Sequence, residues 1–154
     1  MSKIWGPSTW IFLHGLVENI DENKFNTSKF IIWNELLYIC SNLPCLHCSD
    51  HAKKLLRVID PKTIKSKQIL KELLYRFHNV VNKKLEKEKE EMIILDKYKN
   101  IKLSVILTLM INNWARVANK MTIYELANKS NIFNTIEQLK KWIIKNKNLF
   151  INFE

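Results

Sequence analysis

The chain has 154 residues and a formal net charge of +10, with 47% hydrophobic residues, two glycines and three prolines. A chain of this length forms one core, or one core with an extension. Scarce glycine and proline, and the lack of any Asn-Gly or Asp-Gly hairpin signal, argue against a β-rich fold and predict an all-α protein. Three cysteines are too few for a disulfide-stapled secreted scaffold.

The first half of the chain predicts two helices separated by a polar turn. The first spans residues 7–19, where apolar residues recur at helical spacing. Residues 21–26 read as the turn. Thr27 or Ser28 is then expected to cap a second helix that ends near Asn42.

Two more helices complete a predicted four-helix bundle. Pro44 fits the first turn of a third helix, residues 44–59, because a missing N–H costs nothing there. Ser66 is expected to cap a fourth helix, residues 66–85, whose apolar residues share one face. Short connections between the four helices favour a bundle.

A domain boundary is predicted at residue 100. Residues 1–100 would form the bundle, and residues 101–154 a helical extension with helices at 103–119, 122–128 and 135–147. The extension contains neither cysteine nor histidine, so we expect it to pack on the bundle or mediate self-association without redox chemistry.

No targeting segment is expected. Residues 9–17 are apolar but short, interrupted by His14, and lack a small-residue cleavage site. Residues 103–111 are too short to cross a bilayer. The positive charge suggests nucleic-acid binding as one alternative, but the lysines are dispersed and arginine is scarce, which favours a solvated basic surface.

Cys45 and Cys48 form a C-x-x-C motif, which occurs both as a redox dithiol and as half of a metal site. At a helix N-terminus, free backbone N–H groups and the helix dipole stabilise a thiolate and activate it as a nucleophile. The alternative is a structural zinc-binding module. Its ligands would be Cys40, Cys45, Cys48 and one of His47 or His51.

A second polar pattern favours the redox interpretation. His78 and Asn82 lie four residues apart, so a helix places them on one face, and Val81 and Leu85 continue that face. Polar side chains on a buried face need hydrogen-bond partners, which a planar polar cofactor supplies. We therefore expect a dithiol that faces a flavin.

Three motifs occur in order over residues 3–99. They are Trp5-Gly6-Pro7-Ser8-Thr9-Trp10 with Leu13-His14, Leu43-Pro44-Cys45-Leu46-His47-Cys48 with His51-Ala52, and His78-Asn79-x-Val81-Asn82-Lys83-Lys84-Leu85. Together they resemble the Erv/ALR family of FAD-linked sulfhydryl oxidases, and the cysteine motif looks most like that of the short oxidases of large DNA viruses. The resemblance implies a helical bundle around FAD, oxidation of thiols to disulfides, and electron delivery to oxygen to give hydrogen peroxide.

The resemblance also implies roles for individual residues. Cys45 would exchange with the reduced substrate, and Cys48 would lie against the flavin and pass electrons to it. No metal site is implied. The expected FAD contacts are Gly6, Trp10, His14, His51, Tyr75, His78, Asn79, Val81, Asn82, Lys83, Leu85 and Tyr98.

The chain departs from the family pattern at several positions. Leu73 stands where the family usually has tryptophan, and Glu86-Lys87 where it has Gly-Lys. A second, distal cysteine pair is missing, so either reduced protein thiols reach Cys45 directly or a small dithiol carrier protein serves it. Cys40 is expected to be a buried apolar side chain rather than a redox group.

Family members commonly pair through their first two helices, so the resemblance implies a homodimer. Because the sequence indicates neither a signal peptide nor a membrane span, we expect a location in the cytoplasm and no association with a membrane. The viral resemblance implies that this is the cytoplasm of an infected host cell, with the virion as a further location.

Overall fold

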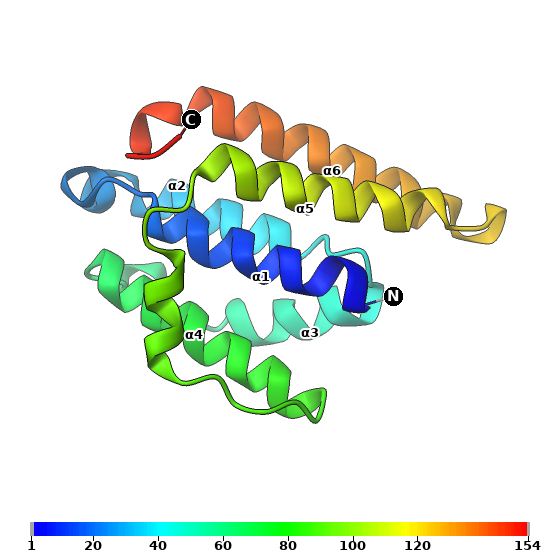
Figure 1. Ribbon diagram of the computed structural model, residues 1–154, viewed down its shortest axis with the longest axis horizontal. Coiled ribbons are helices and arrows are strands. Elements are labelled where there is room, and N and C mark those ends of the chain that lie inside the picture. Colours follow the sequence, from blue (N-terminus) through cyan, green and yellow to red (C-terminus); the bar gives the residue numbers. More distant parts are fainter. Residues whose placement is uncertain (1, 154) are drawn as a thin grey trace.

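The computed structural model describes residues 2–153, and this part of the chain is helical (Figure 1). The α-helices are α1 (Ser2–Glu18), α2 (Glu22–Cys40), α3 (Leu46–Leu56), α4 (Lys67–Lys84), α5 (Leu103–Asn119) and α6 (Leu126–Lys145). Short 3-10 helices are η1 (Pro61–Thr63), η2 (Met92–Tyr98), η3 (Ile123–Glu125) and η4 (Lys147–Leu149). The prediction of an all-α fold is confirmed.

The first helix begins earlier than predicted. α1 starts at Ser2, so Pro7 lies inside it rather than at its start. The missing N–H of Pro7 would otherwise bond the carbonyl of Lys3, which is exposed in the first turn and open to water. The hydroxyl groups of Ser8 and Thr9 donate to the carbonyl of Trp5, at 3.0 and 2.7 Å. The proline therefore costs this helix little.

The second helix also begins earlier, and the predicted turn at residues 21–26 is wrong. α2 starts at Glu22, because Asp21 caps it: its side chain accepts a hydrogen bond from the backbone N–H of Asn23. Thr27 and Ser28, predicted as caps, lie inside α2 and donate to the carbonyl of Lys24 instead.

The start of the third helix differs by two residues from the prediction. Pro44 precedes α3, whose N-cap is Cys45, and α3 ends at Leu56 rather than at Ile59. The fourth helix begins as predicted, because the Ser66 hydroxyl accepts from the N–H of Ile69 at 3.2 Å.

In the C-terminal third, α5 matches the prediction, but one helix replaces the two predicted after it. α6 runs unbroken over Leu126–Lys145. Residues 129–134 contain neither proline nor glycine, and Ile132 in this stretch is fully buried, so packing holds the polar segment in the helix.

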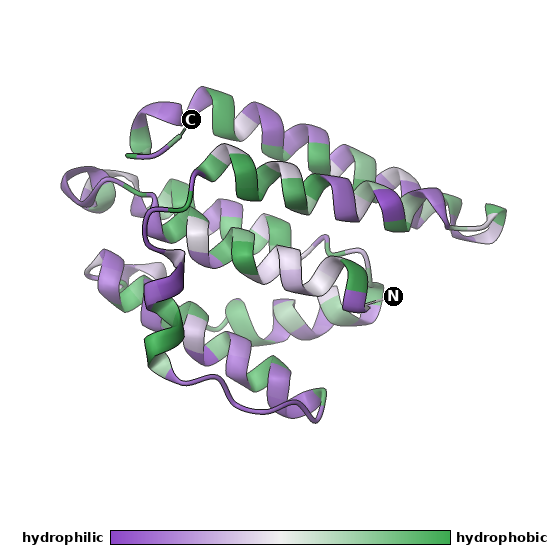
Figure 2. Ribbon diagram, in the orientation of Figure 1, coloured by the Kyte–Doolittle hydropathy of each residue, from purple (hydrophilic) through white to green (hydrophobic). Residues whose placement is uncertain are grey.

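α1 runs through the middle of the molecule, with α5 and α6 on one side of it and α3 and α4 on the other (Figure 1). α5 packs along α1, and α6 packs against α5 and α2. Ile106, Met110 and Trp114 of α5 are buried in the same hydrophobic core as Phe12 and Leu16 of α1. Residues 103–145 thus share the core of the bundle. Hydrophobic and hydrophilic residues alternate along both α5 and α6 (Figure 2).

Within residues 2–153, no helix is both long and apolar enough to cross a membrane.

Candidate active site

A cavity of about 570 Å³ opens on the α3–α4 side of α1. Its lining comes mainly from α1, α3 and α4, with further residues from α2, from η2 and from the segment between α4 and η2. Most of the lining is apolar, and much of it aromatic. The aromatic and histidine side chains that line it are Trp5, Trp10, Phe77, His78, Tyr98, His47 and His51. A cavity of this size and character suits a planar organic cofactor.

Cys45 and Cys48 form a disulfide at the N-terminus of α3. Cys45 is the N-cap residue, and its Sγ accepts a hydrogen bond from the N–H of Cys48 at 3.2 Å. Cys48 lines the cavity, whereas Cys45 lies outside the lining formed by the described residues. Leu46 and His47 between them are exposed. One sulfur of the bond therefore meets the cavity and the other lies away from it.

Four ring side chains stack beside the cavity. Trp10 and His78 lie face to face, with ring centroids 3.9 Å apart and planes 9° from parallel. His14 stacks on Tyr98, with centroids 4.8 Å apart. His14 Nε2 and His78 Nδ1 are 3.1 Å apart, which joins the two stacks by a hydrogen bond. α1, α4 and η2 are thereby held in register at the cavity.

The two histidines of this cluster are neutral at neutral pH. Burial lowers the pKa of His14 to about 3, and the charges of His78 and Lys97 add to the effect. Burial, with Lys97 and Lys87 nearby, lowers the pKa of His78 to about 4. One ring N–H therefore donates to the unprotonated nitrogen of the other ring. His14 Nδ1 is buried and finds no hydrogen-bond partner among residues 2–153, so it remains available to a polar group.

The rim of the cavity is rich in cations. Lys84, Lys87 and Lys97 line it together with Glu88 and Glu90. The three ammonium groups outnumber the two carboxylates, so this part of the lining attracts an anion such as a diphosphate. Aromatic walls, a disulfide sulfur and a cationic rim together fit FAD, which has a flat ring system and a diphosphate.

The structure brings most of the expected cofactor residues to this cavity. Those that line it are Gly6, Trp10, His51, His78, Val81, Asn82, Leu85 and Tyr98. His14 lies beside them, bonded to His78. The remaining three, Tyr75, Asn79 and Lys83, border a second hollow on another side of α4, which shares Lys87 with the cavity.

Several lining residues were not predicted. Phe77 continues the α4 face that holds His78 and Val81, so helical spacing alone gave a signal for it. Trp5 stands one residue before Gly6 in the first motif. Lys87 and Lys97 come from the segment after α4, where no periodic pattern indicates which side chains turn toward the cavity.

Cys40 is buried in the hydrophobic core and also lines the cavity. Burial raises the pKa of its thiol to about 12, so it is a poor nucleophile at neutral pH. The zinc alternative would need Cys40, Cys45, Cys48 and a histidine to converge. The described residues hold no group of three or more His, Cys, Asp or Glu side chains placed to bind a metal.

A helical bundle with a disulfide set against an aromatic cavity is the arrangement of a redox protein that couples a cysteine pair to a planar cofactor. Residues 7–101 match the model of the Erv1 / Alr family, so the chain belongs to this family.

Curated relatives include plant and viral proteins. The chain is 36% identical over 83 residues to the FAD-linked sulfhydryl oxidase ERV1 of Arabidopsis thaliana, covering 53% of this chain and 42% of that protein. It is 29% identical over 86 residues to the putative FAD-linked sulfhydryl oxidase 096R of Invertebrate iridescent virus 3, covering 55% of this chain and 58% of that protein. It is 31% identical over 97 residues to the FAD-linked sulfhydryl oxidase of African swine fever virus (isolate Tick/Malawi/Lil 20-1/1983), covering 63% of this chain and 78% of that protein. The chain thus spans about half the length of the first two relatives. No solved structure matches it significantly.

Proposed function

We propose that the protein is an FAD-dependent thiol oxidase, which converts pairs of protein thiols into disulfides and passes the electrons to oxygen, giving hydrogen peroxide. Membership of the Erv1 / Alr family and the names of the relatives support this function. The observation that carries it is the placement of the disulfide, with Cys48 at the cavity and Cys45 outside its lining.

Cys45 is the proposed site of exchange with substrate. A substrate thiolate attacks Cys45 Sγ, the Cys45–Cys48 bond breaks, and Cys48 leaves as a thiolate. A second substrate thiolate then attacks the substrate sulfur of the mixed disulfide, which releases the substrate disulfide and Cys45. The free N–H groups at the start of α3 stabilise negative charge on the sulfurs during both steps.

Residues around the cavity would hold FAD. When bound, FAD supplies the two-electron acceptor that restores the cysteine disulfide and the site that reduces oxygen. Trp10, His78 and Tyr98 offer ring faces for stacking, and Asn82 offers an amide for the polar edge of a ring. Lys84, Lys87 and Lys97 line the same cavity, and their ammonium groups would neutralise the diphosphate.

The proposed partners are reduced protein thiols or a small dithiol carrier protein, with oxygen as acceptor. The viral relatives support action in the cytoplasm of an infected host cell, or in the virion. Fractionation of infected cells and of purified particles tests this location.

A homodimer through the first two helices is also part of the proposal. α5 packs on α1 and α6 packs on α2, so the surface left for pairing includes the exposed side chains of Phe30 and Ile31 on α2. Light scattering on the wild type and on Phe30→Glu tests this, because a dimer through this face should dissociate in the variant. A wild-type protein of monomer mass would reject it.

The function is tested by an absorbance spectrum and by oxygen consumption with dithiothreitol. Purified protein should show flavin bands. Cys45→Ser and Cys48→Ser should abolish oxygen consumption while FAD stays bound, and Cys40→Ser should keep most of the activity. A colourless protein, or full activity in both of the first two variants, would reject the proposal.

A further inference from the structure

The segment that joins α4 to η2, residues 85–91, forms part of the rim of the proposed FAD site. Leu85, Lys87, Glu88 and Glu90 of this segment line the cavity. The segment is hydrophilic along most of its length (Figure 2). Because few apolar contacts hold such a segment, its position depends on hydrogen bonds.

The start of the segment is fixed by the end of α4. The N–H of Lys87 donates to the carbonyl of Asn82 at 2.9 Å, and the N–H of Glu86 to that of Lys83 at 3.2 Å. With Glu86 at a φ of 54°, these two bonds form a Schellman motif. They end at Lys87, so the rest of the segment needs another anchor.

That anchor is the backbone of Glu90. The Tyr75 hydroxyl donates to the Glu90 carbonyl at 2.8 Å. The Asn79 amide pairs with the same residue twice: Nδ2 donates to its carbonyl at 3.1 Å, and Oδ1 accepts from its N–H at 2.9 Å. Three hydrogen bonds from two residues of α4 therefore converge on one residue of the segment.

Tyr75 and Asn79 lie outside the described lining of the cavity and border the hollow on another side of α4. The Tyr75 ring is buried against Leu95 and Tyr98. Both groups of the Asn79 amide already have partners. These residues are thus placed to act on the segment and not on a ligand inside the cavity.

We propose that Tyr75 and Asn79 are positioning residues that latch residues 85–91 across the mouth of the FAD site and thereby slow the release of FAD. The latch holds the part of the segment that follows Lys87, and Glu88 and Glu90 in that part line the cavity. This inference rests on the proposed function.

The test uses two nearly isosteric variants of the FAD-loaded protein. Tyr75→Phe removes only the hydroxyl. Asn79→Asp keeps the size of the side chain but replaces the donor to the Glu90 carbonyl with an acceptor. Asn146→Asp is the matched control, because Asn146 Nδ2 likewise donates to a backbone carbonyl, that of Trp142, but in the C-terminal third of the chain.

Two quantities are measured for each variant: the rate of tryptic cleavage after Lys87 and Lys89, and the rate of FAD release followed by free-flavin fluorescence. Loss of the latch should raise both rates by about fivefold, the change expected when one hydrogen bond is lost. The control should change neither rate.

Faster FAD release with unchanged cleavage would overturn the proposal in favour of direct contact with FAD. Faster cleavage with unchanged FAD release would show that the segment does not retain FAD, and would overturn it as well. A wild-type protein that purifies without FAD would instead reject the proposed function, and the cleavage rates would still show whether the two side chains hold the segment.

Discussion

Glu86 adopts a backbone conformation that is unfavourable for a residue with a side chain. It follows the C-cap of α4 with a φ of 54°, in the left-handed region that glycine adopts most readily. The Schellman hydrogen bonds around it hold this geometry. The sequence shows glutamate instead of glycine at position 86. Only the structure shows that the Schellman turn after α4 forms despite this.

Replacing Glu86 by glycine should therefore stabilise the protein. Removing the side chain relieves a cost of roughly 1 kcal/mol, less the entropy that glycine loses on folding. We expect Glu86→Gly to raise the melting temperature by about 2–3 °C, measured by thermal unfolding. Glu86→Ala, which keeps a Cβ, serves as the control and should gain much less. An equal gain in both variants would contradict this explanation.

Glu35 is a second residue in an unfavourable environment, because burial disfavours its charged form. It is buried on α2, and its Oε1 finds no hydrogen-bond partner in the described part of the chain. Burial raises its pKa from the ordinary value of 4.5 to about 7. Since the folded state holds this proton more tightly than the unfolded state, the stabilising contribution of the protonated form is lost as pH rises from 4.5 through 7.

Glu35→Gln should remove the loss of stability that accompanies deprotonation of Glu35. We expect the variant to be more stable than the wild type at pH 8, by about 1–3 kcal/mol, and to show no such gain at pH 4. Urea unfolding at the two pH values measures the difference. Glu137→Gln, at an exposed site, is the control. A gain of equal size at both pH values would show that titration of Glu35 is not its cause.

Whether an expected site residue lies at the cavity depends on its position around the axis of α4. His78, Val81 and Asn82 share a helix face, and that periodicity correctly placed them together at the cavity. Asn79 follows His78 in the sequence, but it lies two residues before Val81, and two residues turn the side chain by about 200° around the helix axis, to nearly the opposite side of α4. It therefore leaves the cavity and meets Glu90. Which backbone group it would meet depends on the path of a loop that has no sequence period.

At the level of helices, the starts were harder to predict than the helices themselves. Asp21, Thr27 and Ser28 are all capping residue types. In the structure Asp21 is the cap, so α2 begins more than one turn earlier than predicted and includes the buried Phe25. α6 was predicted as two pieces because its middle is polar, but tertiary packing around Ile132 decides that segment.

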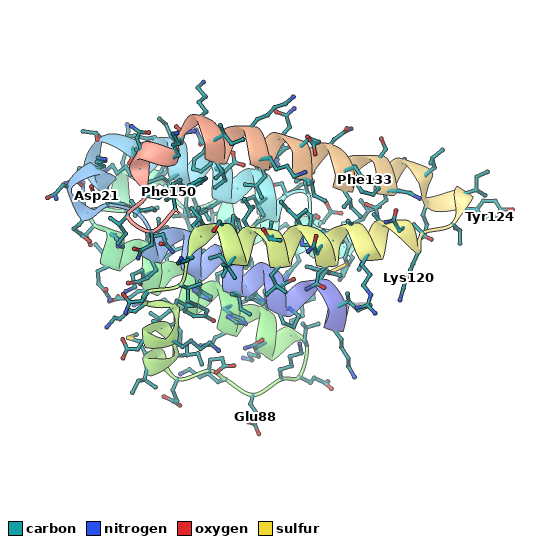
Figure 3. All side chains as sticks on the ribbon, turned by 45° about the horizontal axis from the view of Figure 1, so that its top comes forward. Asp21, Glu88, Lys120, Tyr124, Phe133 and Phe150 are labelled. Atoms are coloured by element: carbon teal, nitrogen blue, oxygen red, sulfur yellow. A yellow bond between two sulfur atoms is a disulfide. The ribbon has the colours of Figure 1, made fainter. Side chains whose placement is uncertain are left out.

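Trp114 tests how strongly α5 stabilises the bundle. Its ring is fully buried, and its Nε1 donates to Thr9 Oγ1 at 2.8 Å. Trp114→Ala leaves a large cavity and should lower the free energy of unfolding by about 3–5 kcal/mol, measured by urea unfolding. Tyr124→Ala is the control, because Tyr124 is 96% exposed at the turn between α5 and α6 (Figure 3). A similar loss in both variants would contradict a specific role for the α1–α5 contact.

For the whole molecule, the question is whether residues 1–100 fold alone. The sequence predicts a boundary there, and every residue that lines the cavity lies between residues 5 and 98. We therefore propose that residues 101–154 take no part in electron transfer. Within this part of the chain, α5 nevertheless buries the face of α1 that contains Phe12 and Leu16.

Truncation after Asn100 should leave that face of α1 exposed, and we expect the shortened chain to aggregate or to unfold below 37 °C. Gel filtration, circular dichroism and FAD content measure the outcome. A truncated protein that is monomeric, binds FAD and oxidises dithiothreitol would establish residues 1–100 as an independent domain. Loss of activity toward protein substrates alone would assign residues 101–154 to docking.

The last described residues join the beginning of the chain by backbone hydrogen bonds. The N–H of Ile151 donates to the carbonyl of Asn19, and the N–H of Asp21 to that of Leu149. These partners are separated by more than 120 residues, so the junction between α1 and α2 closes only after residues 149–151 have been synthesised. Domains with such distant contacts fold more slowly than those with local contacts. During translation, α1 can pair with α4 before α5 has left the ribosome, and it remains uncovered on its other side until then. The time between synthesis and final closure is thus the period in which this chain most needs protection from aggregation.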